Sequence, residues 1–440
     1  MKSVLESNKE NIFKTFENDS IGRNKDVFEF VRYLHEITEH YSIAIDGSWG
    51  SGKTFFVKQA KMVLDSLNPY TQFESEYTED ELLGVKSLWE SYNDAKTKVG
   101  NHLCVYFDAW QYDFDEEPVL SLIYQISQVV SSAYKFETQR NYLNVATNLL
   151  DMFSGYNSKK LLSSLVGSDP VEQTKKYKGL QESINEYFNE LLPEHGERLV
   201  IFIDELDRCN PKYAVKLLER IKHYFVNNKI TFVFSVNLDQ LQHTIKQHYG
   251  QGFDGYGYLD RFFDLPLPMP NLDSKKFYRS IDLDDDYYPS IIAKAMINSY
   301  GMSMRVILRY SSEIKEKCMI GLLRSDYYYQ SKIFCTSIVL PVILGLKHVD
   351  YDAYQDFIQG VDCSALSDIV ISNKALLNRV YYDCFKGKAI DMDEIRNETE
   401  DNIQQIYDAF FSNNADLLIG DISANEITRG YMRKIISKIP

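Results

Sequence analysis

A glycine-rich stretch that ends in a lysine and a hydroxyl residue could bind phosphate groups. The stretch is GSWGSGKT, residues 47–54, and it fits the pattern GxxxxGK[ST]. In such a loop the backbone N–H groups surround the phosphates, Lys53 reaches the β- and γ-phosphates, and the Thr54 hydroxyl binds Mg²⁺. We therefore predict a nucleoside triphosphate site formed by Gly47, Ser48, Trp49, Gly50, Ser51, Gly52, Lys53 and Thr54.

Two adjacent carboxylates follow the apolar run LVIFI, residues 199–203. Asp204 at the end of this run is placed to bind Mg²⁺, directly or through water. Glu205 is the natural general base for the water that attacks the γ-phosphate. Kinase-like phosphate-loop proteins often lack the second acid, so the pair favours a hydrolase.

Polar residues at the end of another apolar run are candidates for sensing the γ-phosphate. The run is KITFVFSVN, residues 229–237. Asn237 is the first candidate, with Ser235 and Asp239 as alternatives. A turn that simply ends a strand would use the same residue types, so both interpretations stay open.

An arginine near the γ-phosphate could stabilise the charge that develops during phosphoryl transfer, within one chain or from a neighbouring subunit. Arg261 lies in YLDRFF, and Arg305 and Arg309 lie on the predicted helix MSMRVILRY, residues 302–310. Arg261 and Arg305 are the predicted catalytic arginines, and an exposed surface arginine is the alternative for each.

Short β-prone segments with helices between them would position these groups. The expected strands lie within residues 42–45, 102–110, 198–211, 229–237 and 261–268. Residues 26–37 have apolar side chains at helical spacing, and residues 55–67 also predict a helix. The alternation predicts an α/β fold with a mainly parallel sheet, and the order of strand, glycine loop and helix is the context that a phosphate-binding loop requires.

A proline cluster, LPLPMP at residues 265–270, predicts a domain boundary. The expected parts are an N-terminal helical segment (1–40), a phosphate-loop domain (41–270) with a helical insertion at about 118–193, and a mostly α-helical C-terminal domain (271–440). The most apolar run, Ile333 to Leu346, is shorter than a bilayer span requires and contains a proline. We expect a buried helix there and no transmembrane segment.

The composition limits the class of protein. With 440 residues, of which 44% are hydrophobic, the chain is long enough for two or three folded domains. A net charge of −15 disfavours a protein that coats DNA or anionic lipid, although a local basic groove is compatible with it. Six scattered cysteines without a CxxC pair, and an N-terminus without the apolar core of a signal peptide, predict a cytoplasmic protein.

Taken together, the motifs resemble those of the KAP family of P-loop NTPases. The matching stretches are, in this order, GSWGSGKT, YFDAW, IDELDRCNP with KLLERIKHYF, FVFSVNLDQLQHTI and YLDRFFDLPLP. The resemblance implies an additional-strand P-loop sheet, in which one strand separates the loop strand from the strand that ends in Asp204. It also implies that Asp204 binds the metal and that Glu205 primes the attacking water.

Further roles follow from the same resemblance. Trp49 would shape the loop or pack under it, and Asp207 and Arg208 would position the acidic strand end or a neighbouring subunit. The chain departs from the family pattern in two places. Arg261 stands where the family usually has lysine, and residues 118–193 lack the spanning apolar runs that many members carry.

The expected function is that of an ATPase that uses ATP and Mg²⁺. Bacterial members of the family resemble components of phage exclusion and defence, so a switch or energy-coupling role in an anti-phage or stress assembly is expected, with a protein partner or a second copy. The alternatives are a nucleotide-gated scaffold with little turnover and a nucleic-acid motor or loader, so a nucleic-acid partner stays open.

Overall fold

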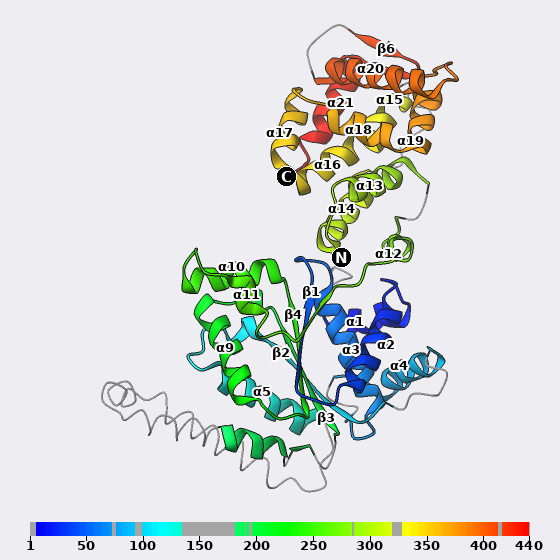
Figure 1. Ribbon diagram of the computed structural model, residues 1–440. Coiled ribbons are helices and arrows are strands. Elements are labelled where there is room, and N and C mark those ends of the chain that lie inside the picture. Colours follow the sequence, from blue (N-terminus) through cyan, green and yellow to red (C-terminus); the bar gives the residue numbers. More distant parts are fainter. Residues whose placement is uncertain are drawn as a thin grey trace. The chain divides into compact units, whose positions relative to one another are not determined.

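The structure is a computed structural model (Figure 1). It describes residues 6–72, 76–92, 99–133, 181–189, 191–192, 196–283, 286–318, 328–411 and 416–439. The chain divides into two compact units, Met1–Asp273 and Ser274–Pro440. Most of the predicted insertion at 118–193 lies outside the described residues.

The first unit is built on a five-stranded parallel sheet. Its strands are β1 (Tyr41–Asp46), β2 (His102–Asp108), β3 (Arg198–Asp204), β4 (Ile230–Val236) and β5 (Leu265–Pro268). Their order is β2-β3-β4-β1-β5, and every neighbouring pair is parallel. Because β4 separates β1 from β3, the predicted additional-strand sheet is confirmed.

Helices cover both faces of this sheet, as Figure 1 shows. One face packs against α1 (Lys9–Glu17), α2 (Asn24–Glu36), α3 (Lys53–Leu67) and α4 (Glu79–Tyr92). The other face packs against α5 (Pro118–Ala133), the helical residues 181–189, α9 (Pro211–Tyr224), α10 (Leu238–Tyr249) and α11 (Gly255–Leu259).

The middle of the sheet is mostly apolar, because both of its faces are buried by helices. In β3, Ile201 and Ile203 belong to one core and Phe202 belongs to the other. Three strands end in or just before a polar residue: Asp46 in β1, Asp108 in β2 and Asp204 in β3. Parallel strands bring all their carboxyl ends to the same edge, and this edge carries the candidate site.

The second unit is mostly helical. It contains α12 (Ser274–Ser280), α13 (Tyr288–Ser299), α14 (Met304–Lys317), α15 (Tyr329–Ile333), α16 (Leu340–Val349), α17 (Tyr351–Gln359), α18 (Ser364–Ser372), α19 (Lys374–Arg379), α20 (Met392–Phe411) and α21 (Glu426–Ile436). Two π-helical segments, η3 (Phe334–Val339) and η4 (Val380–Cys384), and an antiparallel hairpin of β6 (Leu417–Ile419) and β7 (Ile422–Ala424) complete it.

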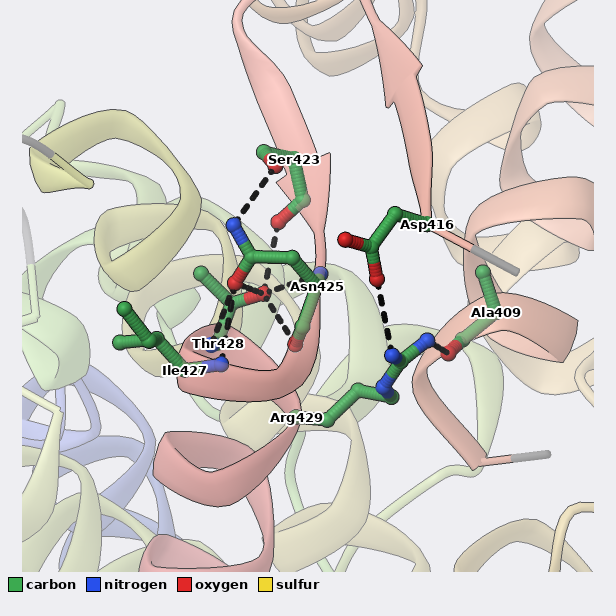
Figure 2. A network of polar contacts seen from close by, with 7 residues as sticks. All are labelled: Ala409, Asp416, Ser423, Asn425, Ile427, Thr428 and Arg429. Carbon is green, nitrogen blue, oxygen red and sulfur yellow. Dashed lines mark hydrogen bonds and ion pairs between the residues drawn. The ribbon is translucent and has the colours of Figure 1, made fainter. Parts of the chain in front are cut away.

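Figure 2 shows how this hairpin is joined to the last helix. The Asn425 side chain accepts hydrogen bonds from the backbone N–H groups of Ile427 and Thr428, and the Thr428 hydroxyl accepts one from the Asn425 backbone. This capping box satisfies N–H groups that have no partner inside the helix. Arg429 then pairs with Asp416 at 2.9 Å, which ties α21 to the start of the hairpin.

The apolar helix of this unit is longer than the sequence predicted. The helix runs continuously over Tyr329–Val349, 21 residues through α15, η3 and α16, whereas the predicted run covered only Ile333 to Leu346. Among the described helices it alone has the length and apolar composition that could cross a membrane, and 67% of its apolar window is buried inside the structure. The expectation that the segment is too short was therefore wrong, because flanking residues extend the helix at both ends.

Candidate nucleotide-binding site

The phosphate loop joins the end of β1 to the start of α3. Gly50 and Gly52 have φ angles of 81° and 92°, which residues with a Cβ atom rarely adopt. A Cβ atom on Gly47 would lie 2.8 Å from Ser51 Oγ and 2.9 Å from Met269 Cβ, so close packing also requires glycine there. Gly52 is the N-cap of α3 and no side chain caps this helix end, so the first N–H groups are available to an anion.

Lys53 is folded back over the loop. Its side chain is buried, and Nζ donates to the carbonyl oxygens of Gly47 and Ser48. Burial lowers the pKa of Lys53, and the nearby carboxylates of Asp207 and Asp204 oppose that effect. A nucleotide phosphate would offer this buried ammonium group a stronger partner than the two carbonyl oxygens.

Thr54 and Asp204 meet although they are 150 positions apart in the sequence. Thr54 Oγ1 donates to Asp204 Oδ2 at 2.7 Å, and the Tyr106 hydroxyl donates to the same oxygen at 2.8 Å. Asp204 is only 2% exposed. One hydroxyl and one carboxylate are the oxygen ligands that Mg²⁺ takes in a phosphate-loop site, where substrate phosphates supply further ligands. The residues present therefore fit the ion, and Thr54 and Asp204 would hold it.

Glu205 follows directly and has an unusual backbone. Its φ of 62° and ψ of 19° are left-handed, a conformation that is uncommon for a residue with a Cβ atom. Burial and the neighbouring Asp204 raise the pKa of Glu205 to about 7, and Arg208 opposes them. The Arg208 Nε atom lies 2.6 Å from Glu205 Oε2. A carboxyl group with a pKa near neutrality can exchange a proton at physiological pH.

Trp49 connects the loop to the acidic strand end. Its indole N–H donates to Asp207 Oδ2 at 2.6 Å. Asp207 is buried, and burial raises its pKa while Lys53 and the Trp49 hydrogen bond lower it. This contact joins the phosphate loop to the residues after β3, and the roles that the resemblance implies for Trp49 and Asp207 stay predictions.

Two contacts of the site escaped the sequence reasoning. Arg23 Nη1 donates to the Ser51 carbonyl at 2.8 Å and so braces the loop from the α1–α2 connection. Burial lowers the pKa of Arg23 to about 10, opposed by Asp26. Tyr106 holds Asp204, and its only sequence signal was its place in the YFDAW stretch. No local pattern relates Arg23 to a loop 28 positions away.

The sensor candidates at the end of β4 differ in their surroundings. Asn237 is the N-cap of α10, and its Oδ1 accepts from the Gln240 backbone N–H at 3.2 Å. Ser235 is 1% exposed, and its hydroxyl has no partner among the described residues. It pairs in register with Asp204 on β3. Asp239 is exposed on α10.

None of the contacts described above involves a predicted arginine. Arg261 is exposed in the turn after α11. Arg305 and Arg309 are exposed on α14 and belong to the second unit. The catalytic role of each remains a prediction.

The phosphate loop, the acidic pair and the additional-strand sheet together define a P-loop NTPase domain. The chain belongs to the KAP family: the model of the KAP family P-loop domain matches residues 27–302. The uncharacterized protein MJ0182 of Methanocaldococcus jannaschii is 25% identical over 172 residues, which cover 30% of this chain and 88% of that protein. The solved ORC2 protein of Aeropyrum pernix aligns over 94% of this chain and 95% of its own, with 11% identity and a TM-score of 0.29.

Proposed function

We propose that this chain binds ATP with Mg²⁺ and hydrolyses it to ADP and phosphate. Membership of a P-loop family supports nucleotide binding. The main observation in support of hydrolysis is the 2.7 Å hydrogen bond between Thr54 and Asp204, with Glu205 as the next residue in the chain. Thr54 and Asp204 are the two residue types that bind the metal in a phosphate-loop enzyme, and Glu205 beside them is a carboxylate that can activate water.

In the proposed mechanism the loop N–H groups and Lys53 bind the β- and γ-phosphates. Mg²⁺, held by Thr54 and Asp204, would neutralise phosphate charge. Glu205 accepts a proton from water as the water oxygen bonds to the γ-phosphorus. The bond from this phosphorus to the bridging oxygen breaks, and ADP leaves with the electron pair. Asn237, or the alternative Ser235, would sense the γ-phosphate, and Arg261 or Arg305 would stabilise its charge.

The nucleotide state would pass to the helical unit Ser274–Pro440 and change a contact with a protein partner or a second copy. We place this switch in a bacterial defence or stress assembly, on the strength of the family resemblance. A net charge of −15 disfavours the alternative of a nucleic-acid motor.

Phosphate release from wild type, Glu205→Gln and Lys53→Ala, each with and without DNA or RNA, tests the proposal. We expect Glu205→Gln to lose about 10²–10⁴-fold in kcat while it keeps ATP affinity, because it lacks only the base. Lys53→Ala should lose affinity, because it lacks the cation that faces the phosphates. Normal turnover in Glu205→Gln would refute the assignment of the base.

Two other results would favour the alternatives. Saturable ATP binding that only Lys53→Ala loses, with no phosphate release in wild type, would indicate a nucleotide-gated scaffold. Stimulation of phosphate release by DNA or RNA would favour the motor.

A further inference from the structure

The Arg208 guanidinium group lies near two tryptophan rings. Its guanidinium carbon is 6.0 Å from the Trp49 ring centroid and 5.8 Å from that of Trp110. Both rings are about half exposed, 46% for Trp49 and 52% for Trp110. With the Arg208–Glu205 ion pair and the Trp49–Asp207 hydrogen bond, these residues form one connected group, which we call the Glu205 clamp: Trp49, Trp110, Glu205, Asp207 and Arg208.

We propose that Arg208 is a positioning residue that orients the Glu205 carboxylate, and that Trp49 links this orientation to the occupancy of the phosphate loop. The proposal rests on the hydrolysis proposed above, because it specifies how the general base of that reaction is held. It adds to the site a regulatory connection between the loop and the base.

The local backbone explains how Arg208 reaches Glu205. The left-handed Glu205 is followed by a single 3₁₀ turn, η2 (Leu206–Arg208), and the Arg208 N–H donates to the Glu205 carbonyl at 3.1 Å. The turn returns the Arg208 side chain to the Glu205 carboxylate. Arg208 engages Oε2, and in the described part of the chain Oε1 has no partner. A carboxylate with one oxygen fixed by a cation can offer the other oxygen to water in a defined direction.

The chemistry of arginine suits this position better than that of lysine. A planar guanidinium group can pair with a carboxylate through its edge and stack on aromatic rings through its faces. Both indole rings lie within cation–π distance of the Arg208 guanidinium group, while its Nε pairs with Glu205. A lysine would keep the charge but lose the planar group that can make both kinds of contact.

Trp49 provides the connection to the loop. It lies between Ser48 and Gly50, and the Ser48 carbonyl now accepts a hydrogen bond from Lys53 Nζ at 3.3 Å. Nucleotide phosphates compete for the same ammonium group. When Lys53 turns to the phosphates, the peptide groups beside Trp49 lose this bond. The Trp49 ring then transmits the change, because it is hydrogen-bonded to Asp207 and lies near the Arg208 guanidinium group.

The first experiment measures kcat and ATP affinity separately for Arg208→Ala and Arg208→Lys. The matched control is Arg220→Ala: Arg220 has the same side-chain exposure as Arg208, 24%, and its Nε lies 3.1 Å from Glu117. We expect kcat of Arg208→Ala to fall about 10- to 100-fold with an ATP Kd within about twofold of wild type, and Arg208→Lys to recover part of the loss.

Arg220→Ala should keep the wild-type kcat. The positioning role is overturned if Arg208→Ala keeps the wild-type kcat, if affinity falls as much as kcat, or if Arg220→Ala loses as much activity. Each of these results would mean that the ion pair is dispensable or only supports the fold.

The second experiment needs no turnover. In Trp110→Phe the remaining tryptophans are Trp49 and Trp89, and Trp89 is only 3% exposed. We expect ADP and ATP to shift the emission of this variant, and the double variant Trp49→Phe/Trp110→Phe to show no shift. If calorimetry shows that Trp110→Phe binds nucleotide while its tryptophan emission does not shift, the proposed link between Trp49 and the phosphate loop is overturned. If wild type binds nucleotide but releases no phosphate, the hydrolysis proposal fails while this experiment still decides the link.

Discussion

Lys61→Met should destabilise the first unit by about 3 kcal/mol, because it leaves a buried carboxylate without its cation. Lys61 lies on α3, the helix that follows the phosphate loop, and is 5% exposed. Its Nζ is 2.7 Å from Asp65 Oδ2 and 2.7 Å from Glu76 Oε2. Burial opposes the charge of Lys61, but the two carboxylates outweigh it and raise the pKa of Lys61.

The two carboxylates contribute unequally to this effect. The Asp65 side chain is 7% exposed and stays buried without the cation, whereas the Glu76 side chain is 48% exposed and can be solvated. Removal of one partner of a buried ion pair costs about 3–5 kcal/mol, and we take the lower end because only Asp65 stays desolvated. Methionine preserves most of the side-chain volume, so the contribution of a cavity is small.

Urea denaturation followed by tryptophan fluorescence measures this loss. All three tryptophans, Trp49, Trp89 and Trp110, lie in the unit Met1–Asp273, so the signal reports the unfolding of that unit. In the double variant Lys61→Met/Asp65→Asn at least half of the lost stability should return, since no buried charge remains. Lys14→Met, which breaks an exposed ion pair with Glu10, should leave the urea midpoint unchanged. A loss of less than about 1 kcal/mol in Lys61→Met would refute the reasoning. Exposed ion pairs contribute no more than that, so burial would then add nothing to this ion pair.

Two further predictions concern polar groups of the sheet. Burial lowers the pKa of His102 to about 4. As the pH falls, the unfolded chain therefore takes up a proton on this histidine before the folded chain does. The free energy of unfolding should fall by about 3 kcal/mol between about pH 6.5 and about pH 4. In His102→Asn this loss of stability at low pH should be absent, which urea titrations at several pH values would measure. Tyr106→Phe should lose about 1.5–3 kcal/mol of stability, because buried Asp204 loses a donor at 2.8 Å; an unchanged urea midpoint would contradict this.

The sequence predicted those parts of the fold and site that depend on neighbouring residues. The loop spacing from Gly47 to Thr54, the apolar run before Asp204 and the helical spacing of residues 26–37 are local patterns, and local backbone preferences determine what they form. The length of the apolar helix at Tyr329–Val349 was misjudged, because the prediction followed the apolar run alone, and the helix also includes the polar and aromatic residues on either side of it.

Contacts between distant residues followed no such pattern. Trp49 and Asp207 are 158 positions apart, and Tyr106 and Asp204 are 98 apart, yet both pairs are hydrogen-bonded. The sequence also did not separate Asn237, which caps α10, from Ser235, which is buried in register with Asp204. The two side chains have different surroundings because Ser235 lies inside β4, whereas Asn237 follows the strand's last residue and begins the turn into α10.

The sequence alone therefore determined that the chain has a phosphate-binding loop, an acidic pair after a buried strand and the motifs of the KAP family. The tertiary structure decided which side chains surround them: Arg23 on the loop, Tyr106 on Asp204, and Arg208 with two tryptophans around Glu205. The physical reason is the parallel sheet, because it brings the carboxyl ends of separate strands to one edge, and the residues that meet there are distant in the chain.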